Sequence, residues 1–317
     1  MKSLQIANLK LKNPLILAPM VDVTDLPYRL LCRRAGAALA YTEMIYIDAI
    51  LHTNKKTESL MKTSKEDSPV GLQITGNSEE EFEKFVKSEK WKKFDLIDLN
   101  CGCPSLRITG SEAGSFLLRN PNKIVRIIKI LKKTDKPVTA KIRLGFKKNN
   151  VMEVACEIEK AGADALTVHA RLAIDGRDVP ADWKWIEQVK KSLKIPVIGN
   201  GDVFSGKDAT QLLKICDGVM IARGAIGDPM SFYRILSYMK TGKEREIDVH
   251  ENLKLFEEYL RLEREIYGDN VDLGRVKYLG GKFLRGFKGA GKKREELMKY
   301  RDIDEISDFI NKTLFVL

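Results

Sequence analysis

The sequence predicts an α/β protein in which a (β/α)8 TIM barrel is followed by a small C-terminal helical domain. Eight short apolar runs rich in strand-forming residues occur in the first three quarters of the 317-residue chain, with segments of helical period between them. Strand, helix and strand at this spacing imply right-handed crossovers and a parallel sheet. The runs are continuously apolar rather than alternating, which is typical of strands buried on both faces.

The eight predicted strands define the barrel units. Helical segments with charged faces separate them, for example SEEEFEKFVKSEKW and NPNKIVRIIKILKKTD. Eight such units over roughly 225 residues favour a closed barrel. An open doubly wound sheet is the alternative and fits less well, because no GxGxxG motif follows the first run. The runs begin at Asn13, Ala38, Pro69, Asp95, Pro137, Ala163, Ile195 and Asp217.

The pattern changes after about residue 240. The segment ENLKLFEEYLRLEREIYG, which begins at Glu251, predicts a long amphipathic helix. No strand-like run follows until the last few residues. We place the domain boundary within MKTGKEREIDV, so that residues 1–242 form the barrel domain and residues 243–317 form the helical domain.

The charge of the chain points to a polyanionic partner. The formal net charge is +11, from 55 Lys and Arg against 44 Asp and Glu. From Arg275 to Arg301 there are ten basic and two acidic residues, interleaved with Tyr278, Phe283 and Phe287. This composition suits a phosphate backbone with some base stacking, whereas a solubilising surface is the alternative. The candidate RNA contacts are Lys277, Lys282, Arg285 and Lys288.

The compartment is predicted from apolar stretches and cysteines. No apolar stretch approaches the roughly 18 residues that span a bilayer, and the N-terminus lacks the layout of a signal peptide. The five cysteines are scattered, which argues against a disulfide framework and for a reducing compartment. We therefore expect a cytoplasmic protein with no membrane association, and a monomer.

Polar or reactive side chains follow every predicted strand. In a barrel, the carboxyl ends of the strands meet on one rim, where active sites are built. One or two polar residues would fall there by chance, but eight ends out of eight predict a ligand at the barrel mouth. These residues are Met20, Asp22, Glu43, Gln73, Thr75, Asn100, Cys103, Lys141, Arg143, His169, Arg171, Asn200, Asp202 and Arg223.

The loops after the seventh and eighth predicted strands, GNGDVFSG and ARGAIGDP, resemble a phosphate site. Gly199, Gly201 and Gly224 would let the backbone approach a ligand, and a helix start follows. Backbone N–H groups and the Arg223 guanidinium would hold the phosphate. The alternative is that these are ordinary turn glycines.

Two cations are predicted on the inward face of the fifth strand. AKIRLG places Lys141 and Arg143 there, and burying both is costly unless an anion neutralises them. A reduced flavin is such an anion, whereas a carboxylate partner for Lys141 is the alternative. His169, at the end of the sixth strand, is predicted to contact flavin or substrate, although a lone histidine is often structural.

The segment DLIDLNCGCP contains two cysteines with different environments. A metal site would need further soft ligands, which the other cysteines do not supply, so we expect no metal. A Cys-Gly-Cys disulfide would be strained. Cys101 has the apolar neighbours of a core residue. Cys103 lies just past the strand on the rim, where a thiol can act as a general acid.

Seven motifs occur in this order along the chain: APMVDVTDLPYR, DLNCGCP, AKIRLG, TVHAR, PADW, GNGDV and ARGAIGDP. Together they resemble the tRNA-dihydrouridine synthases, flavin enzymes that reduce uridines in tRNA. The resemblance extends from about Asn13 to the C-terminal end. It implies an FMN-binding catalytic barrel and a tRNA-binding helical domain, with NADPH or NADH as the reductant.

The resemblance also implies roles for individual residues. Cys103 matches the proton donor, which protonates uridine C5 while flavin N5 delivers a hydride to C6. Asn100 matches the residue that contacts the target base, and Arg143 and Arg171 are candidate substrate contacts. The cofactor-binding positions implied are Ala18, Pro19, Met20, Gln73, Lys141, His169, Asn200, Gly201, Asp202, Ala222 and Arg223.

The sequence departs from the family pattern at two places. Val21 and Asp22 stand where the family more often has Ala-Gly, and ARLAIDGRDVPADW lacks a Gln and a Tyr common in that loop. Two other functions stay open at this level. One is oxidation or reduction of a free pyrimidine by the same flavin and Cys103. The other is a non-catalytic RNA-binding module.

Overall fold

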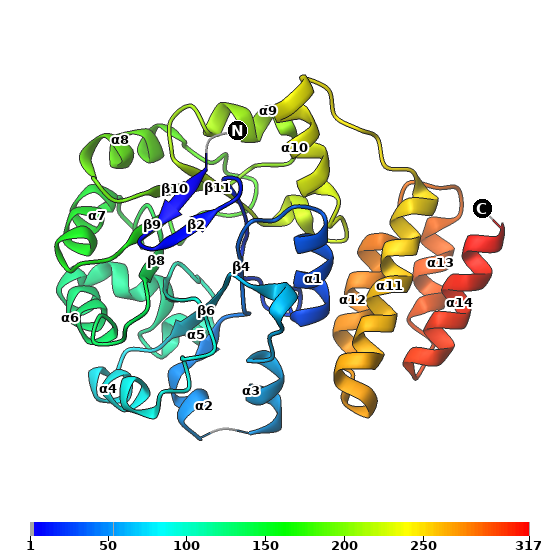
Figure 1. Cartoon of the computed structure of the whole chain (residues 1–317), viewed down its shortest axis with the longest axis horizontal. Helices are drawn as coiled ribbons and strands as arrows, with labels where there is room; N and C mark the ends of the chain where they lie inside the picture. The colour runs from blue at the N-terminus through cyan, green and yellow to red at the C-terminus, as the bar shows by residue number, and fades with distance from the viewer. Residues whose placement is uncertain (1–2, 53, 317) are drawn as a thin grey trace.

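Eight parallel strands form a nearly closed barrel in the computed structural model, which describes residues 3–52 and 54–316 (Figure 1). Their order around the barrel is β3, β11, β10, β9, β8, β7, β6 and β4. A parallel bridge between Ile16 and Leu39 brings the first and last strands of this order together. The strands are β3 (Leu15–Leu17), β4 (Ala40–Tyr41), β6 (Val70–Thr75), β7 (Leu96–Cys101), β8 (Val138–Arg143), β9 (Ala165–His169), β10 (Val197–Asn200) and β11 (Gly218–Ile221).

The second strand of the barrel is interrupted. After β4 the chain leaves the ladder and rejoins β6 as β5 (Ile45–Tyr46). Between the two pieces, the Thr42 hydroxyl accepts a hydrogen bond from the Gln73 N–H at 3.1 Å. The interruption therefore leaves this β6 amide satisfied, as a buried N–H must be.

The helices on the outside of the barrel agree with the predicted alternation. Several begin at a side-chain cap: the Ser78 side chain accepts from the Glu81 N–H, and Ser205 and Asp208 form a capping box. They are α1 (Leu26–Arg34), α2 (Ile47–His52), α3 (Lys55–Leu60), α4 (Glu79–Ser88), α5 (Leu106–Gly110), α6 (Pro121–Leu131), α7 (Val151–Lys160), α8 (Lys184–Ser192), α9 (Gly206–Leu212) and α10 (Ser231–Thr241). Short 3₁₀ turns occur at Lys65–Asp67, Gly114–Arg119 and Arg223–Ala225.

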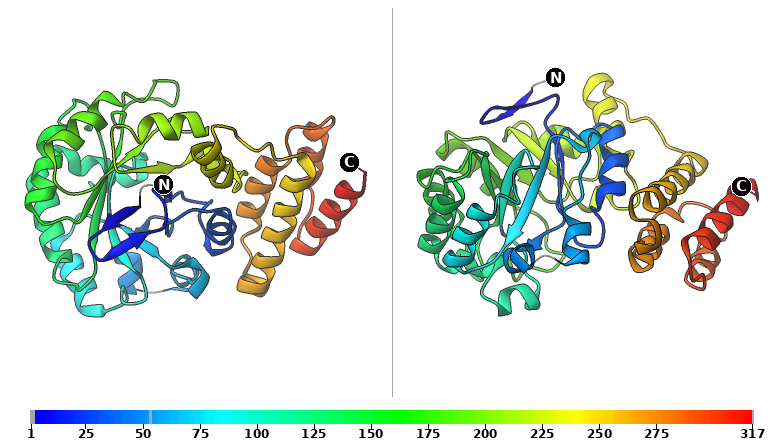
Figure 2. Two further views of the ribbon diagram at one scale, coloured as in Figure 1. Left: turned by 45° about the horizontal axis from the view of Figure 1, so that its top comes forward. Right: turned by 60° about the horizontal axis from the view of Figure 1, so that its bottom comes forward.

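An N-terminal hairpin, which the sequence did not predict, lies at one end of the barrel (Figure 2). Its antiparallel strands are β1 (Leu4–Ile6) and β2 (Leu9–Leu11). Leu4, Ile6 and Leu11 are buried in one apolar cluster with barrel residues that include Ile198 and Met220. The hairpin therefore closes the barrel at the end opposite the carboxyl ends of the strands.

The C-terminal region is helical. It contains α11 (Val249–Tyr267), α12 (Leu273–Phe283), α13 (Ala290–Leu297) and α14 (Ile303–Val316), with a 3₁₀ turn at Gly268–Asn270. It lies beside α1 of the barrel, and residues 243–248 link it to α10 (Figure 1). Aromatic side chains fill the junction: the Tyr28 and Tyr259 rings are 6.1 Å apart, and Phe283 packs against Tyr28 at 6.3 Å. In the described part of the chain, no helix is both long and apolar enough to cross a bilayer.

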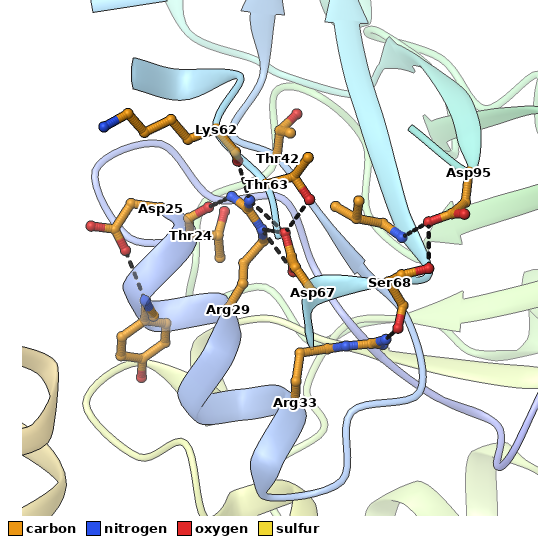
Figure 3. A network of polar contacts seen from close by, with 12 residues as sticks. Thr24, Asp25, Arg29, Arg33, Thr42, Lys62, Thr63, Asp67, Ser68 and Asp95 are labelled. Carbon is orange, nitrogen blue, oxygen red and sulfur yellow. Dashed lines mark hydrogen bonds and ion pairs between the residues drawn. The ribbon is translucent and has the colours of Figure 1, made fainter. Parts of the chain in front are cut away.

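A buried ion pair fixes α1 to the segment that precedes β6 (Figure 3). The Arg29 guanidinium donates to the Asp67 carboxylate, at 2.7 Å for the closest pair, and also to the backbone oxygens of Thr24 and Lys62. Asp67 accepts a further bond from the Thr63 hydroxyl at 3.1 Å. Both charged side chains are almost completely buried, so each depends on the other.

Candidate active site

A cavity of about 370 Å³ opens at the carboxyl ends of the barrel strands. It brings together most of the residues that the sequence predicted for the site, from the first strand and from the fifth to the eighth. The predicted residues that line it are Ala18, Pro19, Met20, Lys141, Arg143, His169, Arg171, Asn200, Gly201, Asp202, Ala222 and Arg223. Gln73, Asn100 and Cys103 are not in its wall: Gln73 is on β6, Asn100 is on β7 next to Lys141, and Cys103 follows the end of β7.

Strand register explains how these residues come together. On neighbouring strands, Asn100 is opposite Lys141, Arg143 is opposite His169, and His169 is opposite Asn200. In a parallel ladder, residues in register point to the same face. The side chains therefore form a continuous polar row around the rim.

A hydrogen-bonded network crosses β6, β7 and β8 inside the barrel. The Asn100 amide donates to the Gln73 side-chain oxygen at 2.8 Å, and the Gln73 amide donates to Asp98 at 2.7 Å. The Thr139 hydroxyl donates to the other Asp98 oxygen at 2.6 Å. Burial raises the pKa of Asp98 to about 6, against the effect of these hydrogen bonds and of Lys141. Sequence reasoning missed Asp98, although an acid within the apolar run DLIDLN was a signal.

Asn100 also determines the path of the backbone that carries Cys103. Its side-chain oxygen accepts from the N–H groups of Gly102 and Cys103 at 3.0 and 2.9 Å. The Arg143 guanidinium donates to the Gly102 oxygen at 2.9 Å. On the far side, the Ser115 N–H donates to the Cys103 oxygen at 3.0 Å. The backbone on both sides of the Cys103 thiol is thus held by hydrogen bonds.

The two neighbouring cysteines differ as predicted. Cys101 is completely buried, and burial raises the pKa of its thiol well above the ordinary value. Cys103 is partly exposed on the rim. All the cysteines are free thiols, and the described residues contain no group of three or more His, Cys, Asp or Glu that could hold a metal ion.

Lys141 is a cation in the wall of the cavity. Desolvation and, to a smaller extent, neighbouring Arg143 lower its pKa to about 8, against the opposing effects of Asp98 and Cys103. Among residues 3–52 and 54–316, its ammonium makes no hydrogen bond or ion pair. An anion in the cavity would supply the missing partner, which is the requirement that a flavin phosphate or a reduced flavin ring meets.

His169 lies among cations and is neutral. Burial, followed by Lys141 and the neighbouring arginines, lowers its pKa to about 2. Its Nε2 is 3.2 Å from an Arg171 guanidinium nitrogen. Because a guanidinium can only donate, Nε2 accepts and the proton resides on Nδ1. His169 can therefore offer an N–H donor, but no charge, to a ligand.

Asp202 joins two arginines of the rim. Its carboxylate accepts two bonds from Arg171, both at 2.7 Å, and one from Arg223 at 2.7 Å. Burial would raise the pKa of Asp202, but Arg171, the Ala181 N–H and Arg223 lower it below its ordinary value. Arg171 and Arg143 also donate to backbone oxygens, so both have internal partners besides any substrate.

The predicted phosphate loops pack closely, but their glycines are not equivalent. Gly201 has φ +119°, and a Cβ there would lie 2.9 Å from the Ala181 side chain. A Cβ on Gly224 would lie 2.5 Å from the Val203 oxygen. Gly199 differs, because its constraint is the Leu212 side chain at 2.9 Å. The expectation that Gly199 faces a ligand is therefore wrong, since it makes room for a helix of the barrel.

The basic C-terminal segment contributes fewer stacking rings than its sequence suggests. Phe283 is completely buried, with its ring 5.2 Å from that of Phe256, so it cannot stack on a base. Phe287 is half-buried against the core. Tyr278 is exposed and lines the cavity. Lys282 and Lys288 are exposed and the Lys277 ammonium donates to the Met298 oxygen, whereas Arg285 is 3.3 Å from Asp228.

Fold and site define a (β/α)8 barrel whose mouth combines a cavity lined by cations with a neighbouring thiol. The chain belongs to the dihydrouridine synthase family, because residues 16–315 match the family described as Dihydrouridine synthase (Dus). It is therefore an oxidoreductase. It is 34% identical to the "Probable tRNA-dihydrouridine synthase 1" of Synechocystis sp., over 99% of this chain and 90% of that protein. It is 32% identical to the "tRNA-dihydrouridine synthase B" of Pseudomonas aeruginosa, over 96% and 93% of the two chains.

Solved structures share the fold at low sequence identity. Morphinone reductase superposes with a TM-score of 0.54 at 17% identity, over 79% of this chain and 91% of that chain. Histamine dehydrogenase from Rhizobium sp. 4-9 superposes with a TM-score of 0.57 at 14% identity, over 82% of this chain and 50% of that one. Both likenesses concern the fold alone.

Proposed function

We propose that the protein is an FMN-dependent tRNA-dihydrouridine synthase, which uses NADPH or NADH to reduce the C5=C6 bond of specific uridines in tRNA. The observation that carries the proposal is the relation between Asn100, Cys103 and Lys141. Asn100 holds the turn that carries the Cys103 thiol, and it is in register with Lys141, a cation of the cavity wall that has no partner among the described residues. This relation supports an anionic cofactor and a proton donor at one mouth.

The proposed FMN site has a contact for each part of the cofactor. Ala18, Pro19 and Met20 would lie against the ring, with Gln73, Lys141 and His169 as hydrogen-bonding groups. Asn200, Gly201, Asp202, Ala222 and Arg223 would hold the ribityl and phosphate groups. The position of Gly201 and Gly224 in the cavity wall and the cations beside them support this assignment.

The chain's own residues would carry the proton part of the reaction. FMN, when bound and reduced by NADPH or NADH, supplies a hydride to C6 of the uridine. Cys103 gives its thiol proton to C5 and regains a proton from water, so one hydride and one proton saturate the double bond. Asn100 would orient the base, and Arg143 and Arg171 would face its carbonyl oxygens or nearby phosphates.

The substrate must reach the cavity as an unstacked base. A uridine inside folded RNA does not expose C5 and C6 to the cavity, so it has to leave its stack. Lys277, Lys282, Arg285 and Lys288 would hold the phosphate backbone meanwhile. We propose the barrel of residues 1–242 as the catalytic domain and residues 243–317 as the tRNA-binding domain of a cytoplasmic monomer.

The direct test is dihydrouridine formation in unmodified tRNA incubated with the protein, FMN and NADPH. We expect product from the wild type and a loss of about a hundredfold or more in Cys103→Ala, because a general acid contributes that much. Cys156→Ala is the matched control, since Cys156 is another partly exposed free thiol, on α7. Equal rates for wild type and Cys103→Ala would remove Cys103 from the reaction.

Two results would favour the rival functions. Oxidation of a free dihydropyrimidine, without activity on tRNA, would assign the flavin and Cys103 to small-molecule metabolism. A protein that binds tRNA but cannot be loaded with flavin would be a non-catalytic RNA-binding module. Lys141 argues against the second rival, because without an anionic cofactor this half-buried cation would have no partner among the described residues.

A further inference from the structure

We propose that Tyr278 is a stacking platform for a nucleotide next to the flipped uridine, so that it determines how RNA enters the site. The inference rests on the proposed function and deepens it. Among the described residues that line the barrel-mouth cavity, Tyr278 alone comes from the helical region. The side chain is 43% exposed. A large aromatic ring is thus left open at the edge of a catalytic cavity.

Tyr278 also borders a second hollow, which lies next to the cavity. That hollow is lined by Val21 and Asp22 from the loop after β3 and by Arg275 from α12, among others. Val21 lines both spaces as well, and it is itself exposed. The partly exposed ring therefore lies where two neighbouring hollows meet, and RNA flanking an inserted uridine would pass it there.

The helix that carries Tyr278 is fixed to the barrel on both sides of the ring. One turn before it, Arg275 is 3.2 Å from Asp25 and 3.0 Å from Glu43. One turn after it, Lys282 packs so closely that a Cβ on Gly227 would lie 2.4 Å from the Lys282 Cβ. A platform for stacking must keep its position while the base arrives, and these two contacts provide that rigidity.

The charge beside the ring fits a nucleotide. The Lys282 ammonium lies 5.2 Å from the centroid of the Tyr278 ring. Within the described part of the chain Lys282 has no acidic partner, so its charge is available to a phosphate. With one face of the ring next to Lys282, a base would stack on the other face. The ring can stack on the base of a nucleotide while the ammonium pairs with the phosphate of the same nucleotide.

Base flipping supplies a reason for such a platform. When a uridine leaves its stack, its neighbour loses a stacking partner, and this loss opposes entry into the cavity. An aromatic ring at the cavity edge replaces the lost partner and tolerates any base identity. The nicotinamide dinucleotide reductant shares the same chemistry, so the test has to separate the two ligands.

The test compares Tyr278→Phe, Tyr278→Leu and Tyr278→Ala in steady-state kinetics with tRNA and with NADPH as the varied substrates. We expect Tyr278→Phe to resemble the wild type, because the ring remains. Tyr278→Ala and Tyr278→Leu should raise the KM for tRNA by about tenfold, with a smaller change in kcat, since one base stack is lost. The KM for NADPH should stay unchanged in all three variants.

Tyr233→Ala is the matched control. Tyr233 is 40% exposed, and the Arg245 guanidinium lies 5.6 Å from its ring, but it does not line the cavity. Wild-type KM for tRNA in both Tyr278→Ala and Tyr278→Leu would overturn the inference. A rise in the KM for NADPH alone would overturn it too and assign the ring to the reductant. Absence of dihydrouridine with the wild type would instead be a failure of the proposed function.

Discussion

Arg275 of α12 forms an ion pair with Glu43 of the barrel, with an N–O distance of 3.0 Å and both side chains buried. The other Glu43 oxygen accepts a hydrogen bond from the Asp22 N–H at 2.8 Å. Asp22 has φ +60°, in the left-handed region that favours glycine. The helical region thereby reaches, through one carboxylate, the loop that follows the first strand and borders the cavity.

We expect Arg275→Met to lower the free energy of unfolding by about 3–5 kcal/mol, because it leaves buried carboxylates without a cation. Burial raises the pKa of Glu43 to about 6, and Arg275 opposes the shift. Without Arg275 the pKa of Glu43 rises further. The loss of stability caused by Arg275→Met should therefore grow as the pH increases above about 6, where Glu43 is ionised in the wild type and pairs with Arg275. Urea unfolding at pH 5 and pH 8 measures this. The double variant Arg275→Met/Glu43→Gln should be more stable than Arg275→Met at pH 8, and a less stable double variant would contradict the account.

The buried ion pair between Arg29 and Asp67 predicts that removing the charge of one partner strongly destabilises the fold. Asp67→Asn should destabilise the fold by about 3–5 kcal/mol, since the Arg29 guanidinium stays buried without its counter-ion. Glu66→Gln is the control, because Glu66 pairs with Arg34 in an exposed ion pair. It should change the free energy of unfolding by less than about 1 kcal/mol. Urea unfolding measures the free energy of unfolding of both variants. Similar losses in Asp67→Asn and Glu66→Gln would mean that burial does not determine how much an ion pair contributes to stability.

Lys141 predicts a pH dependence of FMN binding. The ammonium is charged below its pKa of about 8 and neutral above it. Since an anionic ligand favours the charged form, affinity for FMN should be highest below that pH and fall by about tenfold per pH unit above it. The affinity at each pH can be measured by the quenching of FMN fluorescence, at pH values chosen between about 6.5 and 9.5 to bracket the Lys141 pKa. Lys141→Arg should retain affinity to higher pH, and an unchanged profile in Lys141→Met would exclude Lys141 as the titrating group.

The exposed lysines predict the salt dependence of tRNA binding. Lys288→Ala should reduce the slope of log affinity against log salt by about 1, because one phosphate contact is lost. Arg285→Ala should reduce it less, since Asp228 already offsets that charge at 3.3 Å. Lys84→Ala is the control on the barrel wall, where Glu80 is 2.7 Å away. Fluorescence anisotropy with labelled tRNA at several salt concentrations gives the slope for each variant. Equal slopes for Lys288→Ala and wild type would mean that the tRNA backbone does not contact Lys288.

The barrel and most of the cavity wall were predictable from sequence for a physical reason. Strand ends in a (β/α)8 barrel must converge, so residues such as Lys141, His169 and Asn200 could be grouped without knowing any distance. What sequence could not supply was the direction of each side chain. Phe283 and Tyr278 lie on one helix with the same composition around them, yet one is buried and the other lines the cavity.

Buried polar contacts between distant segments were also beyond sequence reasoning. Arg275 was counted with the basic residues of an RNA-binding segment, but it pairs with Asp25 and Glu43 more than 200 positions earlier in the chain. The hairpin was missed because its strands have only three residues each, too few for a periodic signal. Asp98 was missed because one acid inside an apolar run does not reveal its hydrogen-bond partners.

The N-terminal hairpin has a consequence for the order of events during synthesis. Its leucines are synthesised before the barrel strands, but they pack against Ile198 and Met220, and Gly218 leaves room for Leu4. One edge of the first barrel strand, β3, meets Leu39 early, but its other edge waits for β11. The hairpin and β3 therefore lack part of their native neighbours until the eighth strand has emerged, so the barrel closes late.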